Sequence, residues 1–85
     1  MSRSVELTKR AVRDLDGLTR GRSAIAARIL AKIQSLSDEP STGKPLVGPL
    51  KGIWSLRVGE YRILYEFDKK RVIILTVNHR KEAYR

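Results

Sequence analysis

The sequence contains no cysteine and a single histidine, and both scarcities narrow the chemistry available to it. Without cysteine, neither a disulfide framework nor a thiolate metal site can form. His79 alone rules out a multi-histidine metal site, and we expect no cofactor. The sequence also lacks a signal-peptide pattern and an apolar run of about 18 residues, the length that spans a membrane. We therefore expect a cytoplasmic protein without a membrane partner.

Acidic residues are scarce as well. The chain holds 9 Asp and Glu residues against 18 Lys and Arg residues, a formal net charge of +9. Such an excess favours association with a polyanion, which by charge alone could be RNA, DNA or an acidic protein. The chain has 85 residues, which suits one domain, residues 1–85, with one modest core.

The first half of the chain predicts a strand and two helices. Val5 and Leu7 alternate with polar residues in a candidate strand over residues 2–7. Thr8 can cap a helix over residues 9–18 by accepting a hydrogen bond from a free backbone N–H. Apolar residues three and four apart predict a second helix over residues 22–36. Because the link between them is short, we expect an antiparallel helix hairpin.

The second half predicts a loop followed by a sheet. Residues 38–49 contain three prolines and two glycines, which favour a loop because proline cannot donate to a strand ladder. Residues 54–58 and 61–67 alternate as strands on either side of a Gly59-Glu60 turn. Residues 72–77 are almost wholly apolar and suit a strand buried on both faces.

The predicted fold class is therefore α+β: an N-terminal strand, an antiparallel helix hairpin and a three-stranded antiparallel meander, in a single sheet packed on the helices. The helices should cover the face that carries Trp54, Leu56, Ile63, Tyr65 and Phe67. Arg57 and Arg62 then converge on the opposite face. Like charges across a hairpin destabilise it unless an anion lies between them, so this pair points to function.

These residues resemble a known family. The motif Leu56-Arg57, the strand Tyr61-Arg62-Ile63-Leu64-Tyr65, and the ending Val77-Asn78-His79-Arg80 with Tyr84 close behind are similar to the RelE/ParE superfamily of bacterial and archaeal toxins. The resemblance covers essentially the whole chain. It implies the toxin of a type II toxin–antitoxin pair, held in a hetero-oligomer by a RelB-like acidic antitoxin that folds on binding.

The superfamily has two main activities. RelE-like members cut messenger RNA in the A site of the 70S-type ribosome and so inhibit translation, whereas ParE-like members inhibit DNA gyrase. The resemblance implies catalytic roles for Arg62, Arg80 and Tyr84, which favours the RelE branch. The best-known member also uses two lysines on the strand before the turn, and here Ile53 and Ser55 stand in those places. Lys51 and Arg57 lie nearby in the sequence and are candidate replacements.

Metal-free RNA cleavage requires a base, an acid and a group that stabilises the charged phosphorane while the 2′-hydroxyl attacks the neighbouring phosphate. Arg62 suits phosphate binding because its guanidinium matches two oxygens, although an ion pair with Glu60 or Glu66 is the structural alternative. Arg80 would stabilise developing charge or the leaving group, or lie solvated at a strand end.

Tyr84 would stack on a base or orient the 2′-hydroxyl, or pack on the sheet edge. His79 is the side chain whose unperturbed pKa lies near neutrality, yet it can equally be structural. Three hypotheses follow: a ribosome-dependent mRNA endonuclease, a gyrase inhibitor of the ParE type, and a catalytically weak relative that only binds an antitoxin.

Overall fold

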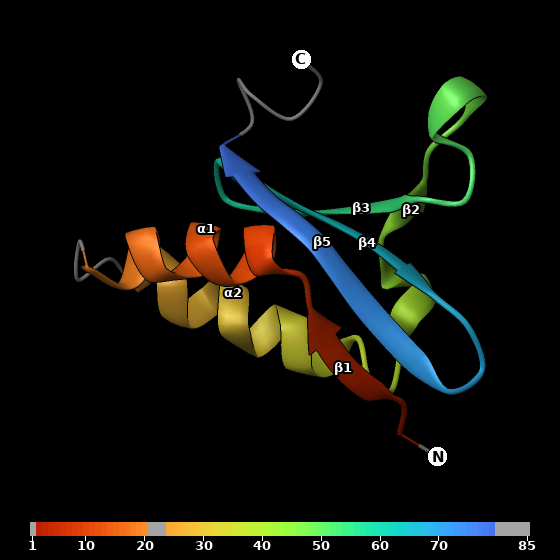
Figure 1. Cartoon of the computed structure of the whole chain (residues 1–85), viewed down its shortest axis with the longest axis horizontal. Helices are drawn as coiled ribbons and strands as arrows, with labels where there is room; N and C mark the ends of the chain where they lie inside the picture. Colours follow the sequence, from red (N-terminus) through yellow and green to blue (C-terminus); the bar gives the residue numbers. More distant parts are fainter. Residues whose placement is uncertain (1, 21–23, 80–85) are drawn as a thin grey trace.

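The computed structural model describes residues 2–20 and 24–79. In chain order, the elements of these residues are β1 (Ser4–Leu7), α1 (Lys9–Arg20), α2 (Ala24–Ser35), the 3-10 helix η1 (Pro40–Thr42), β2 (Lys44–Pro45), the 3-10 helix η2 (Gly48–Leu50), β3 (Trp54–Val58), β4 (Tyr61–Phe67) and β5 (Arg71–His79). Helices α1 and α2 lie side by side against the sheet (Figure 1). The α+β class and the helix–sheet arrangement predicted from the sequence are confirmed.

The described strands form one five-stranded sheet in the order β1-β5-β4-β3-β2. Strand β1 pairs with β5 in parallel, and the other neighbours are antiparallel. Strand β5 is longer than predicted. The prediction that both of its faces are buried was wrong. Val72, Ile74 and Val77 are buried, whereas Ile73 and Leu75 are only half-buried, because the helices cover one face.

The prediction that residues 38–49 form a loop was wrong at Lys44–Pro45, which form strand β2. Lys44 pairs with Ser55 and Pro45 pairs with Trp54, which adds an edge strand to the meander. Proline is tolerated there because one side of an edge strand needs no donor. The next backbone amide, that of Leu46, donates to the carbonyl of Ile53 at 2.8 Å and extends the contact.

Helix α1 begins at the predicted cap and also supports an irregularity in β5. The Thr8 hydroxyl accepts a hydrogen bond from the Ala11 N–H at 3.1 Å and donates to the carbonyl of Leu75 at 2.7 Å. The register between β4 and β5 shifts at this point, because Leu64 faces Thr76 while Tyr65 faces Ile74. This shift is a β-bulge, and it reverses which face the following residues of β5 occupy.

Asp14 provides a hydrogen-bond acceptor for a backbone N–H just after the bulge. Its carboxylate accepts a hydrogen bond from the Val77 N–H at 3.0 Å, and its side chain is only 20% exposed. A buried backbone N–H without a partner is costly, so this carboxylate takes the place of the interrupted ladder. Asp14 therefore has a specific structural role although it lies on a surface helix.

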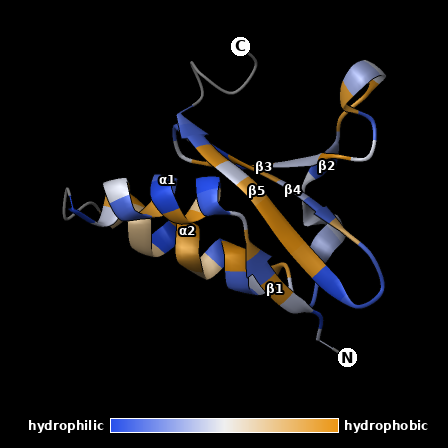
Figure 2. Ribbon diagram, viewed as in Figure 1, coloured by the Kyte–Doolittle hydropathy of each residue, from blue (hydrophilic) through white to orange (hydrophobic). Residues whose placement is uncertain are grey.

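The core lies between the helices and the sheet. Residues of the two helices and of the turn that follows α2 pack against residues of the strands. The first group is Ala11, Leu15, Ile29, Ile33 and Leu36, and the second is Leu56, Val58, Ile63, Tyr65, Val72, Ile74 and Val77. Figure 2 shows the hydrophobic stretch along β5 and the apolar residues of the helices, with polar residues at the chain's turns. Trp54 and Phe67 pack against the edge of this core, with ring centroids 5.2 Å apart. None of the helices in the described residues is long and apolar enough to cross a membrane.

Candidate anion-binding site

The β3–β4 hairpin brings two arginines together. Arg57 and Arg62 are direct partners in the antiparallel register, as the alternation predicted. Gly59 turns the chain with a φ of 59°, which glycine adopts without strain. The Arg57 Nε donates to the Gly59 carbonyl at 3.2 Å, so the turn helps to hold this guanidinium. Both side chains point away from the helices.

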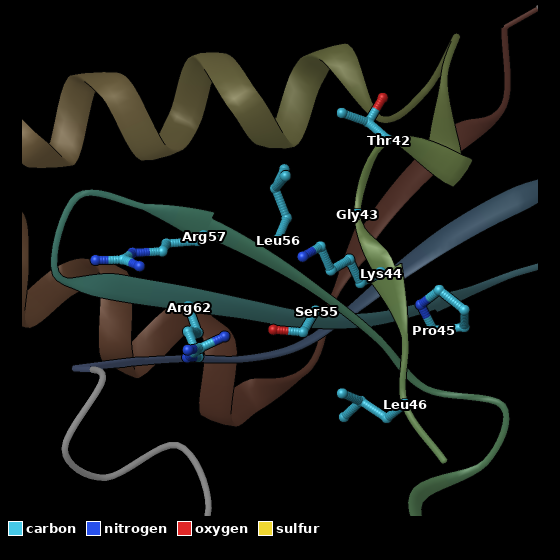
Figure 3. Close-up of a pocket in the computed structure, with 9 residues that line it drawn as sticks. All are labelled: Thr42, Gly43, Lys44, Pro45, Leu46, Ser55, Leu56, Arg57 and Arg62. Carbon is cyan, nitrogen blue, oxygen red and sulfur yellow. The ribbon is translucent and has the colours of Figure 1, made fainter.

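A pocket of about 460 Å³ lies beside this pair, between β2 and the β3–β4 hairpin. Its lining comprises Thr42, Gly43, Lys44, Pro45, Leu46, Ser55, Leu56, Arg57 and Arg62. In Figure 3 the Lys44 amine and the Ser55 hydroxyl point from β2 and β3 toward the side on which Arg57 and Arg62 lie. None of the described residues that line the pocket carries a carboxylate. The site can therefore bind an anion through three cations and a hydroxyl.

Lys44 is the residue that the sequence did not reveal. It comes from the loop whose pairing with β3 was not predicted, and directly opposed residues share a face of the sheet. Lys44 therefore stands on the face that carries Ser55 and Arg57. The only sequence signal was a lysine in a Gly-Lys-Pro run, which by itself indicates a turn.

His79 is not part of this pocket. It pairs with Tyr61, its ring meets that of Tyr61 edge-on at 5.4 Å, and its Nε2 lies 3.5 Å from Glu60 Oε2. Tyr61 and Arg62 are consecutive in β4, so their side chains lie on opposite faces. The β5 bulge thus places His79 on the helix side of the sheet, away from Arg57 and Arg62.

The other predicted site residues are spread more widely. Lys51 follows η2, where its N–H donates to the Gly48 carbonyl at 3.0 Å, and it is not among the residues that line the pocket. Arg80 and Tyr84 lie outside the described residues. Of the candidates within them, the structure brings together Arg57 and Arg62 and adds Lys44.

Three of the aspartates have structural partners. Asp16 pairs with Arg20 at 2.9 Å on the surface of α1, and Asp38 accepts a hydrogen bond from the Ser2 hydroxyl at 2.7 Å. Asp68 accepts the N–H groups of Lys70 and Arg71 in the β4–β5 turn, and these bonds lower the pKa of its carboxyl. Across residues 2–20 and 24–79, no three His, Asp or Glu side chains gather closely enough to hold a metal ion.

Comparison with known proteins identifies the family to which this chain belongs. Residues 5–84 match the family described as the ParE toxin of type II toxin–antitoxin system, parDE. Toxin RelG of Mycobacterium tuberculosis is 41% identical over 88 residues, covering 100% of this chain and 99% of the relative. This chain belongs to the RelE/ParE superfamily of type II toxins. The resemblance seen in the sequence is confirmed.

Further members share the RelE/ParE fold. Toxin RelE of the same organism is 35% identical over 85 residues, which cover 95% of this chain and 84% of the relative. The toxin–antitoxin complex RelBE2 from M. tuberculosis contains a chain that superposes with a TM-score of 0.80 at 39% identity, covering 96% of this chain and 95% of that one. A YoeB/ParE toxin from Agrobacterium tumefaciens, at 22% identity, has a TM-score of 0.77 over 89% of this chain and 96% of its own, which shows the fold alone.

Proposed function

We propose that this RelE/ParE toxin is a ribosome-dependent endoribonuclease that cleaves messenger RNA in the ribosomal A site and so inhibits translation. The observation that carries the proposal is the pairing of Arg57 with Arg62 beside a pocket whose described lining residues include no carboxylate. Two opposed arginines destabilise a hairpin unless an anion joins them, and a phosphodiester is such an anion. Two relatives from Mycobacterium tuberculosis, Toxin RelG and Toxin RelE, support the same interpretation.

Arg62 is proposed to hold the scissile phosphate. Its planar guanidinium can donate to two phosphate oxygens and stabilise the charge that develops when the 2′-hydroxyl attacks and the 5′-oxygen leaves. Arg57 supplies a second positive charge on the same face. In line with the superfamily resemblance, we assign Arg80 to charge on the leaving group and Tyr84 to the reacting nucleotide.

His79 is not proposed as the acid or base. Its ring packs on Tyr61 and lies near Glu60, on the face opposite Arg62. The pocket residues thus supply electrostatic stabilisation, while substrate alignment comes from the ribosome. Cleavage of free RNA should accordingly be weak.

Primer extension on an mRNA translated in a purified system tests the proposal. Cuts at codon-spaced positions should appear only when ribosomes and the toxin are both present. Arg62→Ala should slow cleavage by about 10²–10³-fold, the loss typical of one transition-state donor. Arg13→Ala removes an exposed arginine from α1 and is the matched control. An intact message with wild-type toxin, or equal cleavage by Arg62→Ala, would overturn the assignment.

Gyrase inhibition is the second candidate, because the matching family model describes a ParE toxin and because Ile53 and Ser55 replace the strand lysines of the RelE type. Supercoiling of relaxed plasmid by purified gyrase is the direct assay. Inhibition by both wild type and Arg62→Ala, with no mRNA cleavage, would select this function. Growth without arrest on overexpression would instead select a relative that only binds its antitoxin.

An acidic antitoxin is the proposed protein partner. Solved relatives include the E. coli DinJ-YafQ toxin-antitoxin complex and the YoeB-YefM complex from Staphylococcus aureus. The net charge of +9 favours an acidic segment, and Val12 and Leu30 expose apolar surface on the two helices, where such a segment could pack as it folds. Co-expression with the antitoxin should restore growth and yield a hetero-oligomer on size exclusion.

A further inference from the structure

The pocket extends beyond the arginine pair to the edge strand β2. Lys44 is opposite Ser55 in the sheet register, two positions along β3 from the pair formed by Arg57 and Arg62. Since neighbouring strands lie about 4.8 Å apart, the backbones of β2 and β4 are separated by about 10 Å. The cations therefore span a surface that is wide enough to contact more than one phosphate of an extended nucleic-acid chain.

Ser55 marks the centre of this surface. The residue is 6% exposed, and its hydroxyl oxygen is buried without a hydrogen-bond partner among the described residues. Buried hydroxyls in folded proteins are nearly always hydrogen-bonded, so a ligand is the natural partner for one that lines a pocket. In Figure 3 this hydroxyl lies between the side chains of Lys44 and Arg62.

Lys44 is held in place by a buried tyrosine. The Tyr65 hydroxyl donates to the Pro40 carbonyl at 2.5 Å and accepts a hydrogen bond from the Gly43 N–H at 3.1 Å. A Cβ added to Gly43 would meet this hydroxyl at 2.6 Å and the Ser55 carbonyl at 2.7 Å, so the loop packs directly on β3. The backbone that carries Lys44 is therefore fixed before any ligand arrives, which lowers the entropic cost of binding.

We propose that Lys44 and Ser55 form a second RNA phosphate subsite, which binds the phosphodiester next to the one held by Arg62. Lys44 then supplies, from β2, the positive charge that no lysine on β3 provides. Its ammonium contacts a phosphate oxygen, and the Ser55 hydroxyl donates to the same phosphate or its ribose. Both are positioning residues. This inference rests on the proposed endoribonuclease function, because it assumes that the anion is RNA.

Salt-dependent binding of a short, 2′-O-methylated oligoribonucleotide to the full chain tests the subsite. A lysine that neutralises one phosphate of a single strand contributes about 0.7 to the slope of log K against log salt concentration. Lys44→Ala should therefore lower that slope by about 0.7, whereas Lys44→Arg should retain it. Ser55→Ala should weaken binding several-fold without changing the slope. Lys69→Ala, which removes an exposed lysine from the β4–β5 turn, should change neither quantity.

Ribosome-dependent cleavage gives the second readout. Lys44→Ala should raise the toxin concentration needed for half-maximal cleavage by about tenfold, the equivalent of one lost charged contact. Its urea midpoint should equal that of wild type because Lys44 is exposed. An unchanged slope with Lys44→Ala would overturn the subsite even if wild type cleaves mRNA. Conversely, a lower slope combined with an uncut message would retain the subsite as an RNA-binding surface and reject the endoribonuclease function.

Discussion

Arg57 of β3 stands directly opposite Arg62 of β4, although both side chains carry a positive charge. Directly opposed like charges cost a sheet a few tenths to about 1 kcal/mol. The neighbouring pair on this face, Ser55 and Leu64, carries no charge. The pair is therefore a place where stability is reduced in favour of anion binding, and stability and function should respond in opposite directions when it is changed.

Arg57→Gln is the variant that separates the two effects. It removes the charge and keeps a donor for the Gly59 carbonyl. In low salt, the free energy of unfolding should rise by about 0.5 kcal/mol relative to wild type, and the difference should shrink at about 1 M salt, where the screening length is about 3 Å. Cleavage should fall about tenfold. A salt-independent loss of stability in urea titrations would contradict the repulsion.

Asp14 should be the most important carboxylate for stability. Asp14→Ala leaves the Val77 N–H without its acceptor in a half-buried position and should lower the free energy of unfolding by about 1–3 kcal/mol. Asp16→Ala removes only an exposed pair with Arg20 and should cost no more than about 0.5 kcal/mol. Urea unfolding of both variants gives the comparison. Equal losses would show that the bulge does not depend on Asp14.

Two glycines should respond to alanine in opposite directions. Gly43→Ala places a Cβ 2.7 Å from the backbone carbonyl of Ser55, so the loop must move, at a cost of about 1–3 kcal/mol. Gly17 lies inside α1, and beyond the backbone of its own helix no described atom comes within 4 Å of an added Cβ. Gly17→Ala should therefore stabilise the helix by about 0.5–1 kcal/mol. Thermal unfolding of the two variants measures both. A neutral Gly43→Ala would show that β2 packs more loosely than the structure indicates.

Tyr65 should make stability sensitive to alkaline pH. Burial raises its pKa above the ordinary value of 10.0, so the native state keeps the phenol proton that the unfolded chain releases. The stabilisation is complete below pH 10 and is lost as the pH rises through the native-state pKa.

Tyr65→Phe is the reference variant for this test. Below pH 10 it should be less stable than wild type by about 1–3 kcal/mol, since the Gly43 N–H and the Pro40 carbonyl lose their partner. The difference in free energy of unfolding between the two proteins should narrow above pH 10. Only wild type has a phenol at this position, and its ionisation in the unfolded chain lowers the stability of the native state. Unfolding measured across that range is the assay, and a gap that stays constant would exclude coupling to this phenol.

The sequence by itself determined the order of the two helices and of strands β1, β3, β4 and β5, the face of each helix that packs on the sheet, and the opposition of Arg57 and Arg62. Each of these follows from local periodicity: a 3.6-residue repeat in the helices, a two-residue repeat in the strands, and a short turn at Gly59 that sets the hairpin register. The motifs in β3 and β4 were also sufficient to indicate the superfamily that the comparisons confirm.

The tertiary structure decided the rest of the site. The bulge in β5 depends on Thr8 and Asp14, which lie more than 60 residues away along the chain, and it alone puts His79 on the face away from Arg62. Strand β2 depends on the fit of Gly43 against Ser55 and Tyr65, and this fit brings Lys44 to the pocket. Neither contact leaves a periodic signal, because both satisfy backbone groups through partners distant in sequence rather than through a repeating pattern.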